Sequence, residues 1–169
     1  MNLILCGMMG AGKTSVGMRL AERTGRRWVD TDELIGKKYG EISEIFYRFG
    51  EEYFRQAETE TIRGLSGLDG LVISVGGGLV LWKENVSLLK ENGKIVYLRA
   101  SVQTLEGRLV SDTSRPLLKT EKPLSERLQE MLKFRAPIYE GAADFTIDTD
   151  GKTVSEIVDE ILSVTDENK

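Results

Sequence analysis

The segment that most restricts the fold of this chain is GMMGAGKT, residues 7–14, which matches the pattern G-x-x-x-x-G-K-[ST]. It follows a short apolar run at residues 3–6 and precedes a helical stretch at 14–23. In this context glycines permit a tight turn whose N–H groups, together with the positive end of the helix dipole, attract anions. A plain glycine turn is the alternative, and the complete pattern disfavours it. We therefore predict a phosphate-binding loop in which Lys13 reaches the β- and γ-phosphates of a nucleotide and Thr14 binds Mg²⁺.

Short apolar runs alternate with longer amphipathic stretches along the chain, which is typical of βαβ units around a parallel sheet. The length of 169 residues suits one domain. We predict a single α/β domain over residues 1–169, whose last helix starts with a capping box, TVSE, at 153–156. The predicted strands are 3–6, 27–29, 71–75, 94–98 and 145–147, and the predicted helices are 14–23, 33–39, 42–49, 51–65, 83–91, 124–134 and 153–162.

Composition narrows the expected partners and location. The net charge of −4 lacks the basic excess that sequence-independent binding to nucleic acid requires, so no nucleic-acid partner is expected. The start, MNLILCGMMG, lacks the features of a signal peptide, no stretch reaches transmembrane length, and the lone Cys6 cannot form an internal disulfide. We expect a cytoplasmic monomer without a membrane partner. The absence of histidine removes the usual general base.

Residues 109–122, LVSDTSRPLLKTEK, differ in kind from the rest of the chain. The segment is polar, carries Arg115 and Pro116 at its middle, and interrupts the alternation of strands and helices. We predict a mobile insertion at this point.

Asp30 and Asp32 directly follow the second predicted strand. In an open parallel sheet, ligands gather beyond the carboxyl ends of the strands, where the phosphate loop is also expected. If the strand continues through both residues, their side chains point the same way, one near the metal and the other near an acceptor hydroxyl. Alternatively, Asp32 caps the helix predicted at 33–39.

The third predicted strand runs into three glycines at 76–78. They either let a ligand approach bare backbone amides or form an ordinary loop. Arg55 and Glu58 are three residues apart on a predicted helix and face the same side. They pair either within a site or as a solvated salt bridge.

Arg135 and Tyr139 follow the helix predicted at 124–134. Either both are surface residues, or Pro137 between them marks a helix end that lies close to the core. The residues alone leave both interpretations open.

Six motifs, in this order along the chain, resemble those of the shikimate kinases, and the likeness covers essentially the whole chain. The resemblance implies a parallel sheet of five strands in the order 2-3-1-4-5, flanked by helices as in the nucleoside monophosphate kinases. It also implies a lid at about 109–122 and acceptor-binding helices at about 32–65. The motifs are GMMGAGKT, D-T-D at 30–32, F-R-x-x-E at 54–58, G-G-G at 76–78, R-P-L-L at 115–118 and R-x-x-x-Y at 135–139.

The resemblance implies transfer of the γ-phosphoryl group of ATP to the 3-hydroxyl of shikimate, a small carboxylate with three hydroxyls, in aromatic amino-acid biosynthesis. Arg55 and Arg135 would hold the carboxylate, a planar task that suits guanidinium groups. Asp32 would accept hydrogen bonds from the ring hydroxyls and take a proton, and Glu58 would position Arg55. The implied acceptor-binding residues are Asp32, Arg55, Gly76, Gly77, Gly78 and Arg135, with backbone donors at Gly77 and Gly78.

Phosphoryl transfer needs positioning and charge neutralisation, so Lys13, Mg²⁺ and Arg115 are expected to carry most of the rate effect. Arg115 would swing in as the lid closes and help to exclude water. Asp30 would act on Mg²⁺ through water, Thr14 would be a direct ligand, and Arg108 would stack on adenine. The implied catalytic residues are Lys13, Asp32 and Arg115. The implied nucleotide-binding residues are Gly10, Ala11, Gly12, Lys13, Thr14, Ser15, Arg108 and Arg115.

Two positions depart from the usual patterns. Ser74 occupies the region where an ordinary Walker B motif has an aspartate, which this family tolerates. Residues 148–152, on the expected adenine side, lack the proline that family members carry. The details of base recognition therefore stay open.

Three other functions compete with this interpretation. A kinase of the same fold acting on gluconate or a nucleoside monophosphate is the nearest, and the F-R-x-x-E motif together with the glycine triplet favours shikimate. A GTPase switch is disfavoured, because the only Asn-Lys pair, at 168–169, leaves no room for N-K-x-D. A non-catalytic binding protein is disfavoured, because the expected functional residues are intact: Lys13, Asp32, Arg55 and Arg135.

Overall fold

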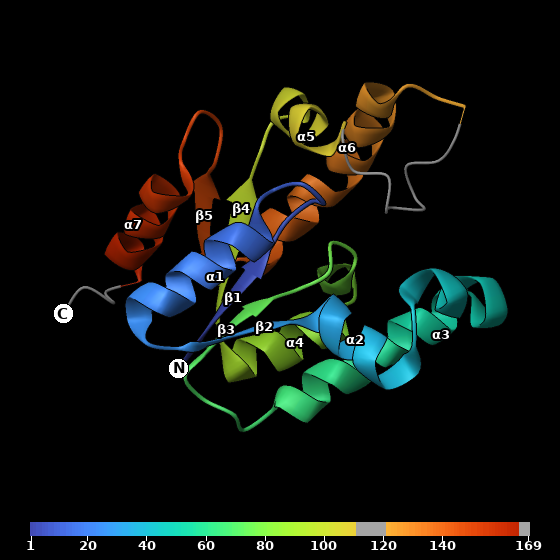
Figure 1. Ribbon diagram of the computed structural model, residues 1–169, viewed down its shortest axis with the longest axis horizontal. Coiled ribbons are helices and arrows are strands. Elements are labelled where there is room, and N and C mark those ends of the chain that lie inside the picture. The colour runs from blue at the N-terminus through green and yellow to red at the C-terminus, as the bar shows by residue number, and fades with distance from the viewer. Residues whose placement is uncertain (111–120, 166–169) are drawn as a thin grey trace.

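The computed structural model describes residues 1–110 and 121–165, which form a three-layer α/β fold (Figure 1). Five parallel strands lie in the order β2-β3-β1-β4-β5. The predicted order is thus confirmed, and each predicted strand agrees with the observed one to within one residue at either end. The strands are β1 (Asn2–Cys6), β2 (Arg27–Asp30), β3 (Leu71–Ser74), β4 (Gly93–Arg99) and β5 (Phe145–Asp148).

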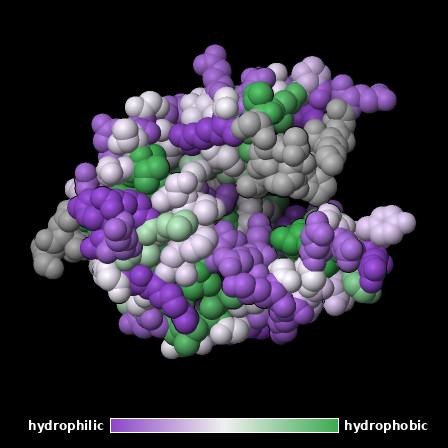
Figure 2. Space-filling view, in the orientation of Figure 1, coloured by the Kyte–Doolittle hydropathy of each residue, from purple (hydrophilic) through white to green (hydrophobic). Residues whose placement is uncertain are grey.

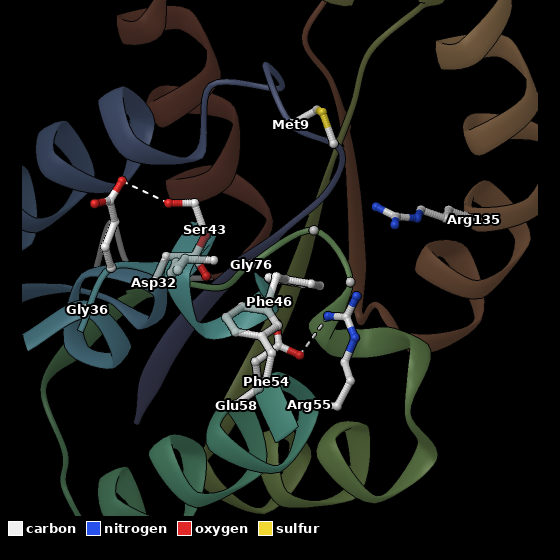
Figure 3. Close-up of a pocket in the computed structure, with 14 residues that line it drawn as sticks. Met9, Asp32, Gly36, Ser43, Phe46, Phe54, Arg55, Glu58, Gly76 and Arg135 are labelled. Carbon is white, nitrogen blue, oxygen red and sulfur yellow. Dashed lines mark hydrogen bonds and ion pairs between the residues drawn. The ribbon is translucent and has the colours of Figure 1, made fainter. Parts of the chain in front are cut away.

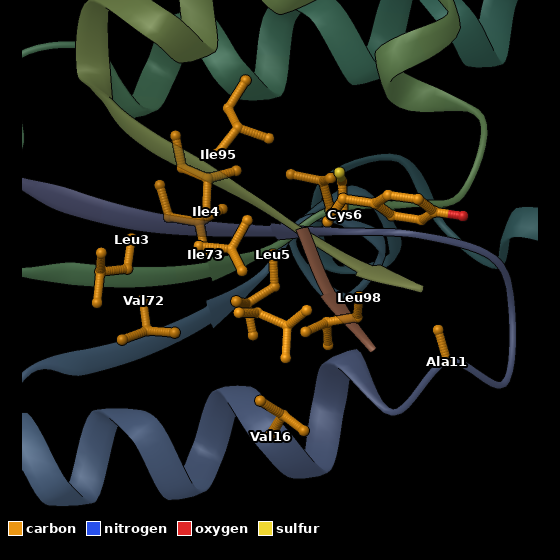
Figure 4. Packing of buried hydrophobic residues seen from close by; sticks show 14 of the residues in the cluster. Leu3, Ile4, Leu5, Cys6, Ala11, Val16, Val72, Ile73, Ile95 and Leu98 are labelled. Carbon is orange, nitrogen blue, oxygen red and sulfur yellow. The ribbon is translucent and has the colours of Figure 1, made fainter. Parts of the chain in front are cut away.

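The position of each strand in the sheet explains its sequence. β1 is central, between β3 and β4, and all of its residues are buried, because helices cover both faces of a parallel sheet. β5 lies at an edge, and its residues alternate between more and less buried positions. Figure 4 shows the side chains of β1 packed with those of its neighbours and of the first helix.

Helices cover both faces of the sheet (Figure 1). On one face lie α1 (Lys13–Thr24) and α7 (Val154–Val164), which contact each other. On the other face lie α4 (Lys83–Asn92) and α6 (Leu124–Ala142), with α5 (Val102–Leu109) packed on α6. The capping box predicted for α7 is present: the Thr153 side chain and Glu156 cap each other's backbone N–H groups.

α2 (Thr31–Tyr39) and α3 (Ile42–Leu65) pack on each other and extend from the edge of the sheet (Figure 1). They enclose a small apolar cluster of their own around Ile35, Ile45 and Phe54. The two helices predicted at 42–49 and 51–65 are the two halves of α3, which meet at a kink where Gly50 has a non-helical φ of 82° and ψ of 176°. The predicted break at Gly50 is therefore confirmed.

Two helical predictions need correction. α5 was missed, although Ser101 caps its N-terminus and accepts a hydrogen bond from the Thr104 N–H at 3.2 Å. α6 does not end near residue 134, and Pro137 lies inside it. Proline removes one backbone donor, but the turn beyond it is retained because Tyr139 and Ala142 are buried.

Most of the predicted insertion at 109–122 lies outside the described residues, which stop at Val110 and resume at Glu121. Arg115 is among the residues that are not described. Among the described residues, no helix is both long enough and apolar enough to span a membrane.

Candidate active site

The loop after β1 has a backbone that glycine accommodates most easily. Gly7, Gly10 and Gly12 have φ values of 143°, 79° and 95°. A Cβ on Gly7 would also lie 2.7 Å from the carbonyl oxygen of Leu98, so the loop packs directly on β4. The glycines of the motif are therefore required by the conformation and by the close approach of β4.

α1 begins at Lys13 without a side-chain N-cap, so the positive end of the helix is directed at the loop. The Lys13 ammonium donates hydrogen bonds to the carbonyl oxygens of Gly7 (2.8 Å) and Met8 (2.9 Å) and lies across the loop. Thr14 and Ser15, in the first turn, are exposed. An ammonium group, two hydroxyls and a helix N-terminus thus surround the loop, which is the set of groups that a nucleoside triphosphate with Mg²⁺ requires.

Arg108, on α5, approaches the same loop and donates a hydrogen bond to the carbonyl oxygen of Gly10 at 3.1 Å. At the start of α5, the backbone N–H of Ser101 donates to Asp150 at 2.9 Å and holds the pKa of that carboxyl below its usual range. Asp150 belongs to the segment that lacks the expected proline. Its carboxylate therefore serves to hold the loop after β5 against the start of α5.

Ser74, the last residue of β3, stands where a Walker B motif would place an aspartate. Its hydroxyl accepts a hydrogen bond from the indole N–H of Trp28 at 3.0 Å and donates one to the carbonyl oxygen of Lys13 at 2.9 Å. Because the indole nitrogen is a donor only, the Ser74 proton must point to Lys13. Gly17 leaves room for this network, since a Cβ there would lie 2.6 Å from the indole nitrogen. Ser74 therefore ties β2 and β3 to the first turn of α1.

Asp30 is the N-cap of α2. Its Oδ1 accepts hydrogen bonds from the N–H groups of Asp32 (2.8 Å) and Glu33 (3.1 Å). The prediction that the strand continues through both aspartates is therefore wrong, and so is the alternative that Asp32 is the cap. Capping stabilises the otherwise unpaired amides of the first turn, which favours a helix start at Thr31. Asp32 lies in that first turn instead.

A cavity of about 450 Å³ lies beyond the ends of β1 and β3, between α2, α3 and α6 (Figure 3). In the space-filling view, a hollow separates the lobe formed by α2 and α3 from the part that contains α5 and α6 (Figure 2). The cavity brings together side chains and backbone from distant parts of the chain. Every predicted acceptor-binding residue lines it: Asp32, Arg55, Gly76, Gly77, Gly78 and Arg135.

Several further lining residues were missed from the sequence. Ile42 and Phe46 are one turn apart on α3, a spacing that indicates a shared face, and Phe54 precedes Arg55 in the F-R-x-x-E motif. Those signals were available in the sequence. The others have no local signal, because the packing of separate elements brings them to the cavity: Met9 comes from the loop after β1, Gly36 from α2, and Glu41 and Ser43 from the turn into α3.

Arg55 and Glu58 form a buried ion pair. Arg55 Nη1 donates to Glu58 Oε2 at 2.7 Å, and only 11% and 1% of the two side chains are exposed. The alternative of a solvated salt bridge is therefore wrong. Burial raises the pKa of Glu58 to about 7, against the opposing effect of the Arg55 charge. The pair fixes the orientation of the guanidinium group at the cavity wall.

The glycine triplet is needed because charged side chains of the cavity leave little or no room for a Cβ at these three positions. Gly78 has φ of −92°, a value that other residues adopt, so its backbone does not require glycine. A Cβ at each of the three positions would instead press on a charged side chain of the cavity. The nearest atoms are Asp32 Oδ1 for Gly76 (2.8 Å), Arg135 Nη1 for Gly77 (3.4 Å) and Arg55 Nη1 for Gly78.

The N–H of Gly76 donates to the Thr31 hydroxyl at 3.1 Å. This N–H is therefore already used within the protein. Thr31 is fully buried and belongs to the first turn of α2. This bond fixes the start of α2, and with it Asp32, against the triplet.

Arg135 reaches the cavity from α6. One turn later the hydroxyl of the buried Tyr139 donates to the carbonyl oxygen of Gly77 at 2.6 Å. The Tyr139 ring also packs on Tyr97 of β4, with ring centroids 5.0 Å apart. Tyr139 is thus a core residue, and it anchors α6 so that Arg135 faces the triplet.

Comparison with known proteins identifies close relatives. A family model described as shikimate kinase matches residues 9–166. The shikimate kinase of Thermodesulfovibrio yellowstonii is 48% identical over 162 residues, which cover 95% of this chain and 92% of that protein. The shikimate kinase of Geobacter sulfurreducens is 44% identical over 169 residues, covering 99% and 92%. A solved structure, shikimate kinase from Acinetobacter baumannii in complex with shikimate, superposes with a TM-score of 0.93 at 38% identity, covering 99% of this chain and 94% of that one.

Glu58→Gln is expected to change how stability depends on pH. Because the pKa of Glu58 is raised in the folded protein, the native state binds more protons than the unfolded state between about pH 4.5 and 7. The resulting contribution to stability is present below this window and is lost as the pH rises through it. Glutamine does not titrate, so the free energy of unfolding of the variant, relative to wild type, should rise across the window by on the order of 1–3 kcal/mol.

Urea unfolding at several pH values across this window measures the difference. Glu60→Gln is the matched control, because Glu60 lies on the same helix and is exposed. It should follow the wild-type curve. Parallel curves for wild type and Glu58→Gln would contradict the raised pKa.

Proposed function

This chain belongs to the shikimate kinase family, and on that premise we propose that it transfers the γ-phosphoryl group of ATP to the 3-hydroxyl of shikimate, in the pathway to chorismate and the aromatic amino acids. The observation that carries the proposal is the position of the cavity against the phosphate loop. Met9 of the loop lines the cavity, and the site of a Cβ on Gly77 lies 3.5 Å from the Gly7 carbonyl oxygen. Acceptor and phosphate groups would thus meet across one wall, as direct phosphoryl transfer requires.

The cavity is polar in a way that orients a hydroxylated carboxylate. Arg135 lies on one side, and Asp32 lies on the opposite side (Figure 3). The guanidinium groups of Arg55 and Arg135 would bind the substrate carboxylate, and the ring hydroxyls would then face Asp32. The backbone amides of Gly77 and Gly78 would complete the acceptor site. The N–H of Gly76 is already bonded to the Thr31 hydroxyl and would not contact the substrate.

Asp32 is the residue we assign to the attacking hydroxyl. It would accept the hydrogen bond of the 3-hydroxyl, orient its oxygen and take its proton during transfer. Lys13 would leave its carbonyl partners and neutralise charge on the β- and γ-phosphates. Arg115, which lies outside the described residues, is proposed to neutralise charge on the transferred group. The remaining nucleotide contacts are proposed at Gly10, Ala11, Gly12, Thr14, Ser15 and Arg108.

The residues beside the loop fit a bound Mg²⁺. Within residues 1–110 and 121–165, no group of three or more acidic, cysteine or histidine side chains forms a metal cluster. Mg²⁺ in kinases keeps several waters and needs few protein ligands, so the exposed Thr14 hydroxyl would suffice as the direct ligand. Asp30 would act through water with its second oxygen, since Oδ1 caps α2. When bound, Mg²⁺ neutralises charge on the phosphates.

We further propose one kinase domain over residues 1–169, with a lid at about 109–122 and acceptor-binding helices at about 32–65. A cytoplasmic monomer without membrane or nucleic-acid partners is part of the same proposal. It is supported by the net charge of −4 and by the single, buried Cys6.

ADP release from Mg-ATP tests the function directly. We expect release that depends on shikimate and is absent with gluconate, with nucleoside monophosphates and without an acceptor, because the paired arginines suit a carboxylate on a small ring. ADP release with gluconate or with a nucleoside monophosphate would instead indicate a kinase that acts on that acceptor. Shikimate binding without ADP release would indicate a non-catalytic binding protein.

Arg135→Ala is expected to weaken shikimate binding and to leave ATP binding nearly unchanged, because the lost hydrogen bonds are made to the acceptor. Loss of a charged hydrogen-bonding partner should raise the KM for shikimate roughly 30-fold or more. Lys133→Ala is the control, since Lys133 is an exposed residue of the same helix. Equal losses in the affinities for ATP and shikimate would contradict the assignment of Arg135 to the shikimate carboxylate.

Asp32→Asn is expected to lower kcat by roughly 10²-fold or more, because asparagine keeps the shape of the side chain and cannot take the proton. Steady-state kinetics with saturating ATP and shikimate measure the change. Glu33→Gln removes a charge from the neighbouring, exposed position and should have little effect. Near-normal turnover by Asp32→Asn would remove Asp32 from the chemistry.

A further inference from the structure

Glu41 is an acidic residue in an unusual position at the turn between α2 and α3. α2 ends at Tyr39, the next residue, Gly40, turns the chain with a φ of 97°, and Glu41 then occupies the N-cap position of α3. Its side chain makes no capping hydrogen bond to the helix. It lines the cavity instead, where Asp32 and Arg55 are also found.

The carboxylate of Glu41 is held by a neighbour but is not neutralised. The Ser43 hydroxyl donates a hydrogen bond to Glu41 Oε1 at 2.9 Å, which is the dashed line at Ser43 in Figure 3. Across residues 1–110 and 121–165, no lysine or arginine forms an ion pair with Glu41. By contrast, Glu44 in the next turn pairs with Arg48 at 4.0 Å. One oxygen of Glu41 is thus held by Ser43, and the exposed side chain lines the cavity.

Glu41 and Ser43 belong to the acidic end of the cavity. In Figure 3, Ser43 and Asp32 lie on the side opposite Arg135. Gly36, one turn after Asp32 on α2, has no atom within 4 Å of the position a Cβ would take, so this end of the cavity is open. An acceptor whose carboxylate is bound by the arginines would present its hydroxyls to this end.

We propose that Glu41, oriented by Ser43, is a specificity-determining residue that accepts a hydrogen bond from a ring hydroxyl of the acceptor other than the phosphorylated one. The proposal rests on the proposed function, in which the acceptor is shikimate. The two oxygens of Asp32 can bind two hydroxyls, and shikimate carries a third. A second carboxylate at the same end gives that hydroxyl a charged acceptor and disfavours molecules that carry a negative charge there.

Kinetics with mono-deoxy analogues test this assignment. Glu41→Ala should raise the KM for shikimate about tenfold, with kcat and the KM for ATP nearly unchanged, because one hydrogen bond to a charged group is lost. For wild type, the KM of one of the two analogues, 4-deoxyshikimate or 5-deoxyshikimate, should be about tenfold higher than that of shikimate. Glu41→Ala should lose this difference in KM. Glu41→Gln keeps an oxygen that can accept the hydrogen bond, so this variant should retain part of the discrimination against the deoxy analogue.

Glu44→Gln is the matched control, because it removes the same charge one turn along α3 from a residue that is exposed like Glu41 but is not part of the cavity lining. It should behave as wild type with all three compounds. Equal discrimination by wild type and Glu41→Ala, with shikimate still phosphorylated, would overturn the role of Glu41 alone. Failure of wild type to phosphorylate shikimate would overturn the proposed function, and the role of Glu41 with it.

Discussion

The absence of side chains at three consecutive residues is the constraint on which the site depends. After β3, the backbone at Gly76–Gly78 lies where Cβ atoms would overlap or crowd the charged groups of α2, α3 and α6. Each helix can therefore bring one functional side chain against the end of the central sheet. Tyr139 and Thr31 then hydrogen-bond the same backbone, so α6 and α2 are fixed to the surface that they approach. The triplet acts as a shared reference surface for the acceptor site.

The buried pair of Arg55 and Glu58 illustrates the cost and the use of charge at this surface. Removing both groups from water is unfavourable, and the raised pKa of Glu58 reflects that cost. The gain is orientation: Glu58 holds one edge of the guanidinium, which leaves the group in a defined position at the cavity wall. Arginine suits this task because its planar, always charged group offers several donors at once.

On the nucleotide side, the structure replaces a charged contact with a neutral one. The Ser74 hydroxyl accepts a hydrogen bond from the indole N–H of Trp28 and donates one to the carbonyl oxygen of Lys13. These two bonds tie the sheet to the first turn of α1. The position of a Walker B aspartate is thus used for alignment of the helix. In the proposed function, charge neutralisation is left to the ammonium of Lys13 and to groups that approach from outside the sheet.

The sequence by itself determined the phosphate loop, the parallel sheet and the residues that meet at its edge. These follow from local patterns: glycines at fixed spacing, short apolar runs, and motifs that keep their order along the chain. Only the tertiary structure decided that Asp30 caps α2, that Pro137 lies within α6, and that the Arg55–Glu58 pair is buried. Each outcome depends on burial or hydrogen bonding with residues elsewhere, which spacing does not encode. For the same reason Glu41 became visible as part of the cavity only once the turn at Gly40 had placed it there.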